Sequence, residues 1–391
     1  MSVFLRGSMR SSKYIIKRRL QSANILSVQD QGQVFHSLFY ILDSDEYWGT
    51  ARDLILVSAP DMEQAGHREV WMERVNQGIT RSYALKDLMT KAWLHIYLGE
   101  LYQYQAQYQQ ARTQFESSIA YFGKENKIQE HGRSLISLGN VARLERSFDE
   151  ATQLIQEGFE LAGHIKEEEL HSYIVQSVMA LDVYDWNKAK YFAEKSLVLA
   201  REIHDRRMEA WSLNNLLLAS WGRKEYKLAI ACYEEAIKLF KIVTDPVHEA
   251  LVKMNMGIVY VELNQLDEAL EFYLTAESIF SQRQDWAYVA MVNNNLGMAY
   301  HQLKEWNKAE DSYNVCMNQW KRLSNIRELV NVMDNLGLLY LAQTFYDRAI
   351  QVFSEALSLL NHIQHDPNYD FFFKMVSENL HSAKEQKIAA L

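Results

Sequence analysis

Apolar residues recur along most of the chain at the spacing of an amphipathic helix, and short polar breaks separate the helical stretches. A second pattern, with a longer period, is superimposed on the helical spacing. Anchor positions, mostly small, recur every 40 residues, with one spacing of 38, at Gly99, Gly139, Ser177, Leu217, Gly257, Gly297 and Gly337. Each copy holds two helical stretches. The pattern therefore predicts an all-α solenoid of antiparallel helix pairs, with about seven repeats.

Two further positions recur within each repeat. Twelve residues after the anchor stands an alanine, at Ala111, Ala151, Ala189, Ala229, Ala269, Ala309 and Ala349. Four residues later comes a mostly aromatic position, at Phe115, Ile155, Ala193, Tyr233, Tyr273, Tyr313 and Phe353. Bulk at the anchor or the alanine would push two helices apart. We therefore expect the two helices of each repeat to cross closely at these positions.

The polar breaks carry residues that cap helices. Within repeats an Asp or Asn follows an apolar residue, as in Trp306-Asn307, and we expect it to cap the second helix. Between repeats, residues 40 apart should mark the start of each new first helix, at Asp205, Asp245, Asp285 and Asn325. Pro246 suits the first helical position after Asp245.

Composition agrees with a helical, compact chain. Three prolines and fifteen glycines in 391 residues are too few for a fold rich in strands and turns. The two cysteines, Cys232 and Cys316, cannot form a disulfide framework and fit a reducing compartment. No apolar run is long enough to span a membrane. We therefore expect a cytoplasmic protein with no membrane span.

These features together resemble the tetratricopeptide repeat. The family's signature is matched in repeat 6 by Leu296, Gly297, Tyr300, Ala309, Tyr313 and Cys316. Seven such repeats would cover 86–361. The period of 40, instead of 34, and the missing closing proline are similar to a class found in bacterial regulator sensor arrays and in cell-polarity adaptors. The resemblance implies a right-handed superhelix whose first helices line a groove.

The two ends of the chain depart from the repeat. Residues 1–30 form a basic leader with a charge of +5, and no fold is assigned to it. Its composition fits a transit peptide, a solvated tail or a first helix. Residues 31–85 form an N-terminal helical region with a diverged hairpin over 46–79, in which we expect Pro60 in the turn. Residues 362–391 form a C-terminal capping helix.

The net charge of −9 is unevenly spread, since everything after the leader sums to −14. A protein that tracks phosphates normally shows a basic face. An acidic body therefore argues against nucleic acid as the partner.

Asparagines stand two residues before four of the anchors, at Asn215, Asn255, Asn295 and Asn335. We call these four residues the asparagine ladder. In resembling families this position faces the groove and commonly clamps a peptide backbone, and a carboxamide can both donate and accept hydrogen bonds. Alternatively, the ladder cross-links neighbouring repeats and fixes their twist. Asn294 and Asp334 add polar groups to the same face.

Apolar residues surround the ladder on the first helices. The expected partner-binding positions besides the ladder and Asn294 are Trp211, Leu218, Met254 and Met298. Cations on this face are few, with Arg133 and Arg143 expected to stand alone. A groove that binds the terminal carboxylate of a peptide would need basic residues beside the ladder. We therefore expect an apolar protein or peptide segment, extended or helical, in the groove. Pairing of two copies through their terminal repeats stays open.

No catalytic motif is present. The chain lacks a Gly-rich phosphate loop, a G-x-S-x-G elbow and a C-x-x-C pair. His362, His365 and Asp366 come nearest to a metal set, but they lack the partners that a site needs. We therefore expect no enzyme activity, no cofactor and no metal.

Three functions remain. The first is a non-catalytic scaffold or adaptor that binds a partner in the groove. The alternative is a peptide-responsive signalling regulator, because length and repeat number resemble the quorum-sensing tetratricopeptide proteins of Gram-positive bacteria. The third is a subunit of a larger complex that binds through the convex face.

Overall fold

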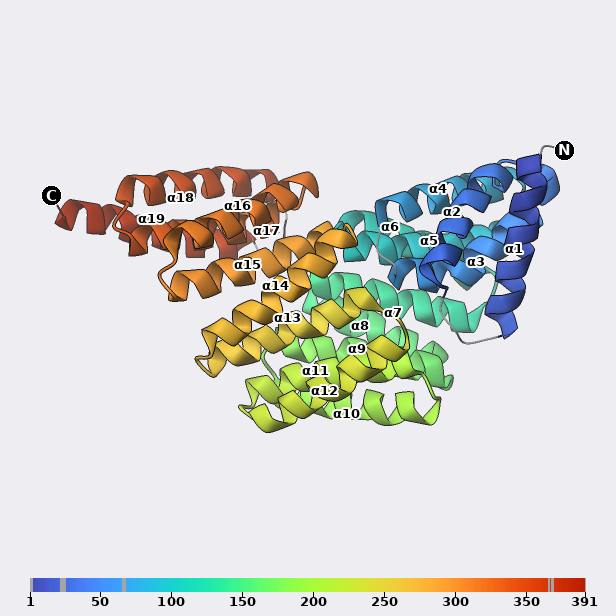
Figure 1. Cartoon of the computed structure of the whole chain (residues 1–391), viewed down its shortest axis with the longest axis horizontal. Coiled ribbons are helices and arrows are strands. Elements are labelled where there is room, and N and C mark those ends of the chain that lie inside the picture. The colour runs from blue at the N-terminus through green and yellow to red at the C-terminus, as the bar shows by residue number, and fades with distance from the viewer. Residues whose placement is uncertain (1–2, 22–25, 65–67, 365, 367–368, 391) are drawn as a thin grey trace. The chain divides into compact units, whose positions relative to one another are not determined.

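The computed structural model describes residues 3–21, 26–64, 68–364, 366 and 369–390. Every regular element in these ranges is helical (Figure 1). Contacts divide the chain into two compact units. The N-terminal unit comprises Met1–Tyr104, Tyr108–Leu144 and Phe148–Val252, and the C-terminal unit comprises Gln105–Gln107, Glu145–Ser147 and Lys253–Leu391. No helix in the described ranges is long and apolar enough to cross a membrane.

Three helices precede the repeats: α1 (Val3–Gln21), α2 (Val28–Ile41) and, after a 3₁₀ turn at Asp45–Tyr47, α3 (Trp48–Gln64). They share one core with α4 (Arg68–Ala84) and the first repeat. Buried members of this core are Ile15, Leu38, Ile55, Trp71 and Leu98. The segment ahead of the repeats is therefore packed onto them, and α1 lies wholly within the basic leader.

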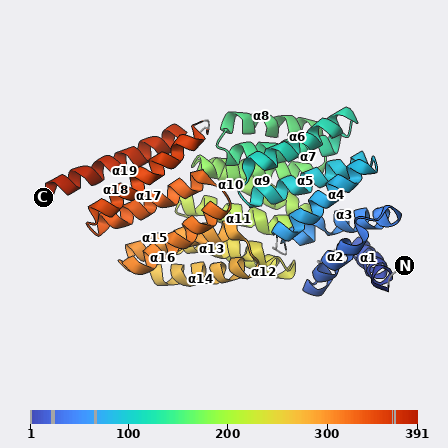
Figure 2. The ribbon, with the colours of Figure 1, turned by 90° about the horizontal axis from the view of Figure 1, so that it is seen from above.

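The repeats are helix pairs, and within each compact unit consecutive helices contact one another (Figures 1 and 2). The first helices are α5 (Leu88–Tyr104), α7 (Ile128–Leu144), α9 (Lys166–Asp182), α11 (Arg206–Gly222), α13 (Pro246–Glu262), α15 (Trp286–Gln302) and α17 (Ile326–Ala342). The second helices are α6 (Tyr108–Lys124), α8 (Phe148–Ala162), α10 (Trp186–Glu202), α12 (Tyr226–Ile242), α14 (Leu266–Gln282), α16 (Trp306–Arg322) and α18 (Tyr346–Leu360). The predicted all-α fold of antiparallel helix pairs is confirmed.

The turns explain the period. Most helices have 17 residues and three residues join them, so two helices and two turns make 40. The single spacing of 38 arises because α8 has only 15 residues. Most turns contain a non-glycine residue with positive φ, such as Lys224 or Lys304. A backbone hydrogen bond, such as the one from Glu225 N to Ser220 O at 2.8 Å, closes the turn. This closure ends most of the helices without the proline of the shorter repeat.

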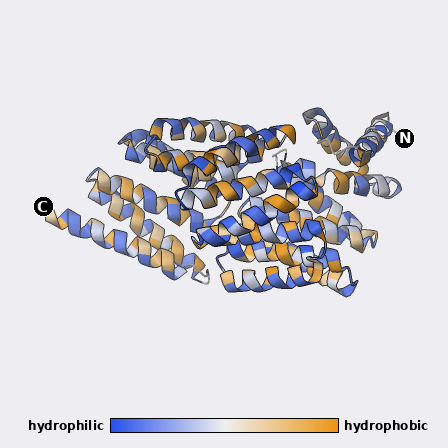
Figure 3. Cartoon of the chain, turned by 90° about the horizontal axis from the view of Figure 1, so that it is seen from below, coloured by the Kyte–Doolittle hydropathy of each residue, from blue (hydrophilic) through white to orange (hydrophobic). Residues whose placement is uncertain are grey.

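The two helices of a repeat cross closely, as predicted. A Cβ built on Gly297 would lie 2.4 Å from the Tyr313 ring, and one on Gly337 would lie 2.4 Å from the Phe353 ring. In repeat 3 the larger anchor Ser177 faces the small Ala193, and its hydroxyl donates to the Ala189 carbonyl at 3.0 Å. A larger anchor is therefore offset by a smaller partner. Apolar and polar residues alternate along the helices (Figure 3), as amphipathic packing requires.

Caps between repeats follow the prediction for the most part. Asp205 accepts from the Arg207 and Met208 amides, and Asp245 and Asn325 accept similarly. Helix α15 begins after Asp285 without a cap bond from that side chain.

Within repeats the predicted caps are wrong by two residues. Helix α16 begins at Trp306 itself, so Asn307 lies inside its first turn. The residue before the aromatic is the cap, as in α10, where Asp185 accepts from the Lys188 amide at 3.0 Å.

Pro60 does not lie in a turn. It lies inside α3, which continues to Gln64. A proline costs a helix one hydrogen bond, yet the helix continues beyond it. The neighbouring Leu54, Ile55 and Ala59 are buried in the core, and this packing holds the helix in place.

The last element, α19 (Tyr369–Ala389), follows a 3₁₀ turn at Asn361–Ile363 and packs against α18 and α17. It buries Val376 and Ala383 in the same core as Phe353 and Leu360. It thus occupies the place of the first helix of a further repeat.

Candidate binding surface

First helices of neighbouring repeats contact one another as well as their own partners. In the N-terminal unit α7 contacts α9 and α9 contacts α11, and in the C-terminal unit α15 contacts α17. The first helices therefore form an inner layer within each unit. A side chain that points away from the second helices lies on the free face of this layer, which we call the first-helix face.

The first-helix face of the C-terminal unit is open and apolar. Met291, Met298 and Leu338 are 41%, 45% and 37% exposed. Asn294 and Asn295 lie among them, half-buried. Exposed methionine is flexible and polarizable and adapts to varied apolar surfaces. This face combines apolar contact area with carboxamides that can bond a peptide backbone.

One ladder residue joins two repeats. Asn335 Nδ2 of α17 donates to Asn294 Oδ1 of α15 at 2.9 Å, and Asn294 Nδ2 lies 3.7 Å from Met298 Sδ. A matching bond follows one helix later, where Asn379 Nδ2 of α19 donates to Asp334 Oδ1 at 2.8 Å. Burial raises the pKa of Asp334, and the bond from Asn379 opposes that rise.

The sequence analysis missed Asn379. Its distance from Asn335 is 44 residues, outside the 40-residue period. The helical pattern after Pro367 could have predicted it, if this segment had been interpreted as the first helix of a further repeat.

The other ladder residues of this unit differ from Asn335. The Asn295 side chain is half-buried, and it makes no hydrogen bond to another described residue. Asn255 is 7% exposed and is engaged within the protein. Met254, expected at the binding face, is only 3% exposed. Of these residues, Asn295 is therefore the one whose side chain can still form hydrogen bonds with a partner.

In the N-terminal unit the expected binding residues are packed more deeply. Asn215 of α11 is 2% exposed, and its Nδ2 has no hydrogen-bond partner in the part of the chain that the structure describes. The Trp211 ring lies 4.7 Å from the His248 ring and 6.4 Å from Phe240. Leu218 packs against the cluster that holds Ala180 and Ala219. Trp211 and Leu218 therefore stabilise the fold here.

A buried ion network lies beside Trp211. Asp245 Oδ2 accepts from Arg207 Nε at 3.1 Å and lies 2.7 Å from His248 Nδ1. The Asp245 and His248 side chains are fully buried. Burial alone would raise the pKa of Asp245, but His248 and Arg207 outweigh it and hold the pKa below its usual range. The network joins α11 to α13 and was not foreseen beyond the cap role of Asp245.

The two cations expected on the groove face, Arg133 and Arg143, each pair with an acid of a neighbouring repeat. Arg133 lies 3.4 Å from Glu100 and over the Trp93 ring, and Arg143 bonds Asp182 and Asn140. These pairs were not foreseen, because each acid comes from a neighbouring repeat, 33 or 39 residues away.

Polar groups gather around Arg133 on α5, α7 and α9. Burial raises the pKa of Glu168, and burial with the nearby Arg133 charge lowers the pKa of His171 to about 3. His171 is therefore neutral at physiological pH.

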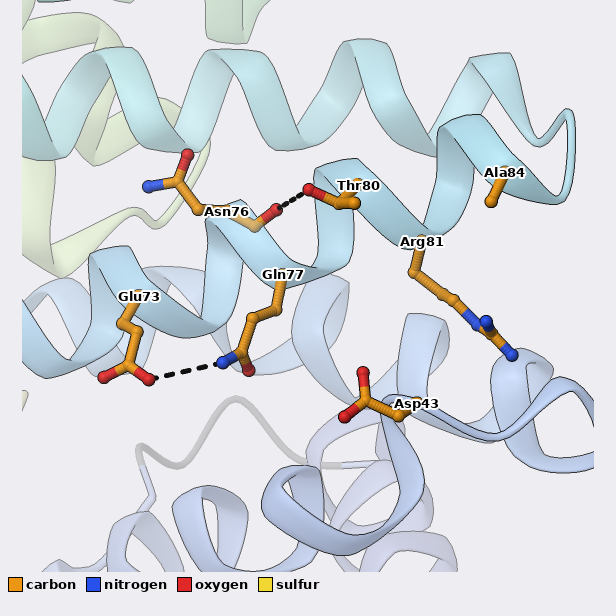
Figure 4. Close-up of a pocket in the computed structure, with 7 residues that line it drawn as sticks. All are labelled: Asp43, Glu73, Asn76, Gln77, Thr80, Arg81 and Ala84. Atoms are coloured by element: carbon orange, nitrogen blue, oxygen red, sulfur yellow. Dashed lines mark hydrogen bonds between the residues drawn. The ribbon is translucent and has the colours of Figure 1, made fainter.

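A separate hollow lies at α4 (Figure 4). It measures about 460 Å³, and its lining is Asp43, Glu73, Asn76, Gln77, Thr80, Arg81 and Ala84. Its polar groups already bond one another: Gln77 with Glu73, and Thr80 with the Asn76 carbonyl. Arg81 also pairs with Asp45 outside the hollow, so few polar groups are left open and the hollow is a weak candidate for a ligand.

No constellation for metal or thiol chemistry emerges. Within the described ranges no three His, Cys, Asp or Glu residues gather closely enough to hold a metal, and His365 lies outside these ranges. Cys232 and Cys316 are buried free thiols. Burial raises the pKa of Cys232 to about 12 and also raises that of Cys316.

Family models identify the repeat. Two models described as tetratricopeptide repeat match this chain, one over residues 212–241 and 250–282 and the other over 288–362. Residues 212–362 therefore carry tetratricopeptide repeats, which confirms the resemblance. No curated protein matches the sequence.

Solved structures share the fold over most of the chain. The Rap conjugation gene regulator of the plasmid pLS20, in complex with the Phr* peptide, has 11% identity and a TM-score of 0.56 over 98% of this chain and 96% of that one. Aspartyl phosphate phosphatase F from Bacillus subtilis has 11% identity and a TM-score of 0.51 over 93% and 96%. NprR in complex with its cognate peptide NprX has 14% identity and a TM-score of 0.51 over 71% and 83%. At these identities the likeness shows the fold.

Proposed function

We propose that this chain is a non-catalytic protein- or peptide-binding scaffold or adaptor. Its C-terminal unit holds an apolar segment of a partner on the first-helix face. The observation that carries this proposal is the exposed set of Met291, Met298 and Leu338 on the same face as Asn295, whose carboxamide makes no hydrogen bond to another described residue. Contiguous exposed apolar surface next to polar groups is typical of an interaction site.

The chemistry of this face suits a backbone as ligand. Asn295 can give an N–H and accept at its carbonyl oxygen, as a peptide bond requires, whatever side chains the peptide has. The apolar neighbours then select for side chains that need burial. Two of the similar structures are complexes with a peptide, Phr* and NprX. These complexes support a peptide ligand here, in a cytoplasmic setting that the buried free thiols also fit.

A library of linear peptides displayed on phage tests the proposal. The full chain is immobilised, bound peptides are selected, and their affinities are measured by fluorescence anisotropy. Selected peptides should be apolar and should bind the N295A/M298A variant at least about tenfold more weakly, from one lost hydrogen bond and one lost contact. The control variant N314A/N318A changes two exposed asparagines on α16 and should bind as wild type does. Equal loss in both variants, or selection of no peptide, would contradict the proposal.

A second candidate is a peptide-responsive signalling regulator. The observation in its favour is that α1, α2 and α3 form a packed helical group in front of the repeats and share a core with α4 and α5. Such a group gives a regulator an output element. Hydrogen exchange of the full chain with a selected peptide separates the candidates: altered protection in α1–α3 favours the regulator, and changes confined to the C-terminal unit favour the scaffold.

A further inference from the structure

The outward face of α1 carries a straight basic stripe. Arg6, Arg10, Lys13 and Lys17 follow one another at spacings of four, three and four residues, so they lie along one side of the helix. All four are exposed. The described part of α1 contains no acidic residue. We call these four residues the basic stripe.

The remaining arginines of α1 have a different role. Arg18 pairs with Asp30 at 2.8 Å, and Arg19 pairs with the fully buried Asp61 at 2.6 Å. These two arginines tie α1 to α2 and α3. The stripe residues form no ion pair within the described chain. Asp53 lines a shallow hollow together with Lys13 and Lys17, but it already pairs with Arg52 at 2.9 Å. The stripe is therefore not needed to hold the fold together.

Apolar side chains flank the stripe. Tyr14 is 60% exposed and Leu20 is 74% exposed, and the helical period places them on either side of the four cations. Phe4, near the start of the helix, lies on the other side of α1, where its ring stacks on Tyr40 at 6.0 Å. That side of α1 also buries Ile15 and packs Leu5 and Ile16 against α2 and α3. Tyr14 and Leu20 are therefore the apolar residues left exposed beside the stripe.

We propose that α1 is a docking surface for an anionic lipid membrane. The helix lies flat on the bilayer, with the basic stripe against the headgroup phosphates and with Tyr14 and Leu20 in the interfacial region. A helix with cations and interfacial apolar residues on its outer side binds in this way. Each cation near an anionic leaflet adds to the attraction, and the attraction is screened by salt.

Charge and shape favour a flat lipid surface over a nucleic acid. The stripe runs about 16 Å along a straight helix axis, which suits a plane. The chain beyond residue 30 sums to −14, so a polyanion that wrapped further around the protein would be repelled. A membrane touches α1 alone. Exposed apolar side chains beside the cations also gain free energy at a bilayer interface.

Vesicle sedimentation tests the proposal with the full chain. Vesicles of phosphatidylcholine are compared with vesicles that also contain phosphatidylserine, at low and at high salt. The wild type should sediment with the phosphatidylserine vesicles at low salt only. The variant R6Q/R10Q/K13Q/K17Q should bind them on the order of 100-fold more weakly. Circular dichroism and thermal unfolding establish that this variant folds as the wild type does.

The matched control removes the same number of positive charges elsewhere. Lys188 in α10 and Lys227, Lys238 and Lys241 in α12 are exposed and form no ion pair among the described residues. The variant K188Q/K227Q/K238Q/K241Q should sediment as the wild type does. Equal loss in both variants would mean that total charge, and not the stripe, attracts the protein, and this would overturn the proposal.

A second variant separates lipid from other polyanions. Y14S/L20S keeps every charge and should bind phosphatidylserine vesicles several-fold more weakly, because it loses the interfacial contacts. Its binding to heparin and to duplex DNA should stay at the wild-type level. If the wild type binds DNA more tightly than vesicles, or if Y14S/L20S binds vesicles unchanged, the stripe is not a lipid surface. None of these readouts depends on a peptide at the first-helix face.

Discussion

Asn335 Nδ2 donates a hydrogen bond to Asn294 Oδ1 at 2.9 Å and so links α17 to α15. The two residues lie 41 positions apart, one repeat plus one residue. The bond holds the neighbouring first helices in register in the absence of any ligand. One member of the asparagine ladder therefore has an architectural role, while Asn295 is left open to a partner.

This bond predicts an energetic coupling between the two residues. N294A and N335A should each destabilise the C-terminal unit, and the double variant should lose less than the sum, with a coupling of about 1 kcal/mol. Urea unfolding of the four proteins in the double-mutant cycle measures it. Strictly additive losses would mean that the bond does not contribute to stability in solution.

Asn295 should behave differently from Asn335. N295A removes a carboxamide without a partner among the described residues, so the free energy of unfolding should change by less than about 0.5 kcal/mol. Affinity for a bound peptide should fall about fivefold, the effect of one neutral hydrogen bond. Thermal unfolding and fluorescence anisotropy on the same samples measure the two effects. A large loss of stability with unchanged affinity would assign Asn295 to architecture as well.

The anchor glycines predict a steric conflict. G297A places a Cβ 2.4 Å from the fully buried Tyr313 ring, and the variant should lose about 1–3 kcal/mol of stability through overpacking. Repeat 3 contains the compensating combination, Ser177 opposite Ala193. The double variant G297S/Y313A should therefore pack without the clash, although it loses the aromatic contacts. Thermal unfolding compares the two, and an unchanged melting temperature for G297A would contradict the close crossing.

The Asp245 network predicts a dependence of stability on pH. The pKa of Asp245 is lowered in the folded protein, so its carboxylate contributes stability that is present above its unfolded pKa of about 3.9. This contribution is lost as the pH falls below about 4 toward the folded pKa.

D245N keeps a capping side chain but leaves Arg207 without its carboxylate, and it should cost about 2–4 kcal/mol at neutral pH. D185N changes an exposed cap of the same type and should cost much less. Unfolding between pH 3 and 7 should show a weaker acid dependence in D245N than in the wild type. Equal acid dependence in both would place the titrating group elsewhere.

The two cysteines predict slow thiol chemistry. Burial raises the pKa of Cys232 to about 12 and raises that of Cys316 as well, so at mild alkaline pH both remain protonated and shielded. An aromatic disulfide reagent should label neither thiol in the native protein and both in denaturant. Rapid labelling of one thiol would show that its repeat opens locally.

The sequence predicted the helix pairs and their period because both depend on local spacing. The anchors, the alanines and the aromatics report which faces must meet, and Gly297 against Tyr313 shows that they do. The positions of the helix caps were harder to predict from the sequence. The Asx residues after Trp306 and Tyr346 look like caps, but the turn closes on a non-glycine residue with positive φ, and this shifts the helix start to the aromatic.

Partners from different repeats could not be read from the sequence. The pairs Arg133 with Glu100 and Arg207 with Asp245 join residues 33 and 38 positions apart, and nothing in a local pattern selects one acid among many. The same limit applies to the ladder. Its regular spacing predicted equivalent residues, but burial differs from Asn215 to Asn295 because neighbouring side chains differ.

The most direct test of the proposed function asks which helix layer touches the partner. A photoreactive benzoylphenylalanine replaces Met298 on the first-helix face or Val315 on α16, which are 45% and 38% exposed. Each protein is irradiated with a selected, labelled peptide, and the crosslinked yield is measured with and without excess unlabelled peptide. Crosslinking from position 298 that the unlabelled peptide abolishes, with none from position 315, is the expected result. Specific crosslinking from position 315 alone would place the partner on the second helices and contradict the proposal.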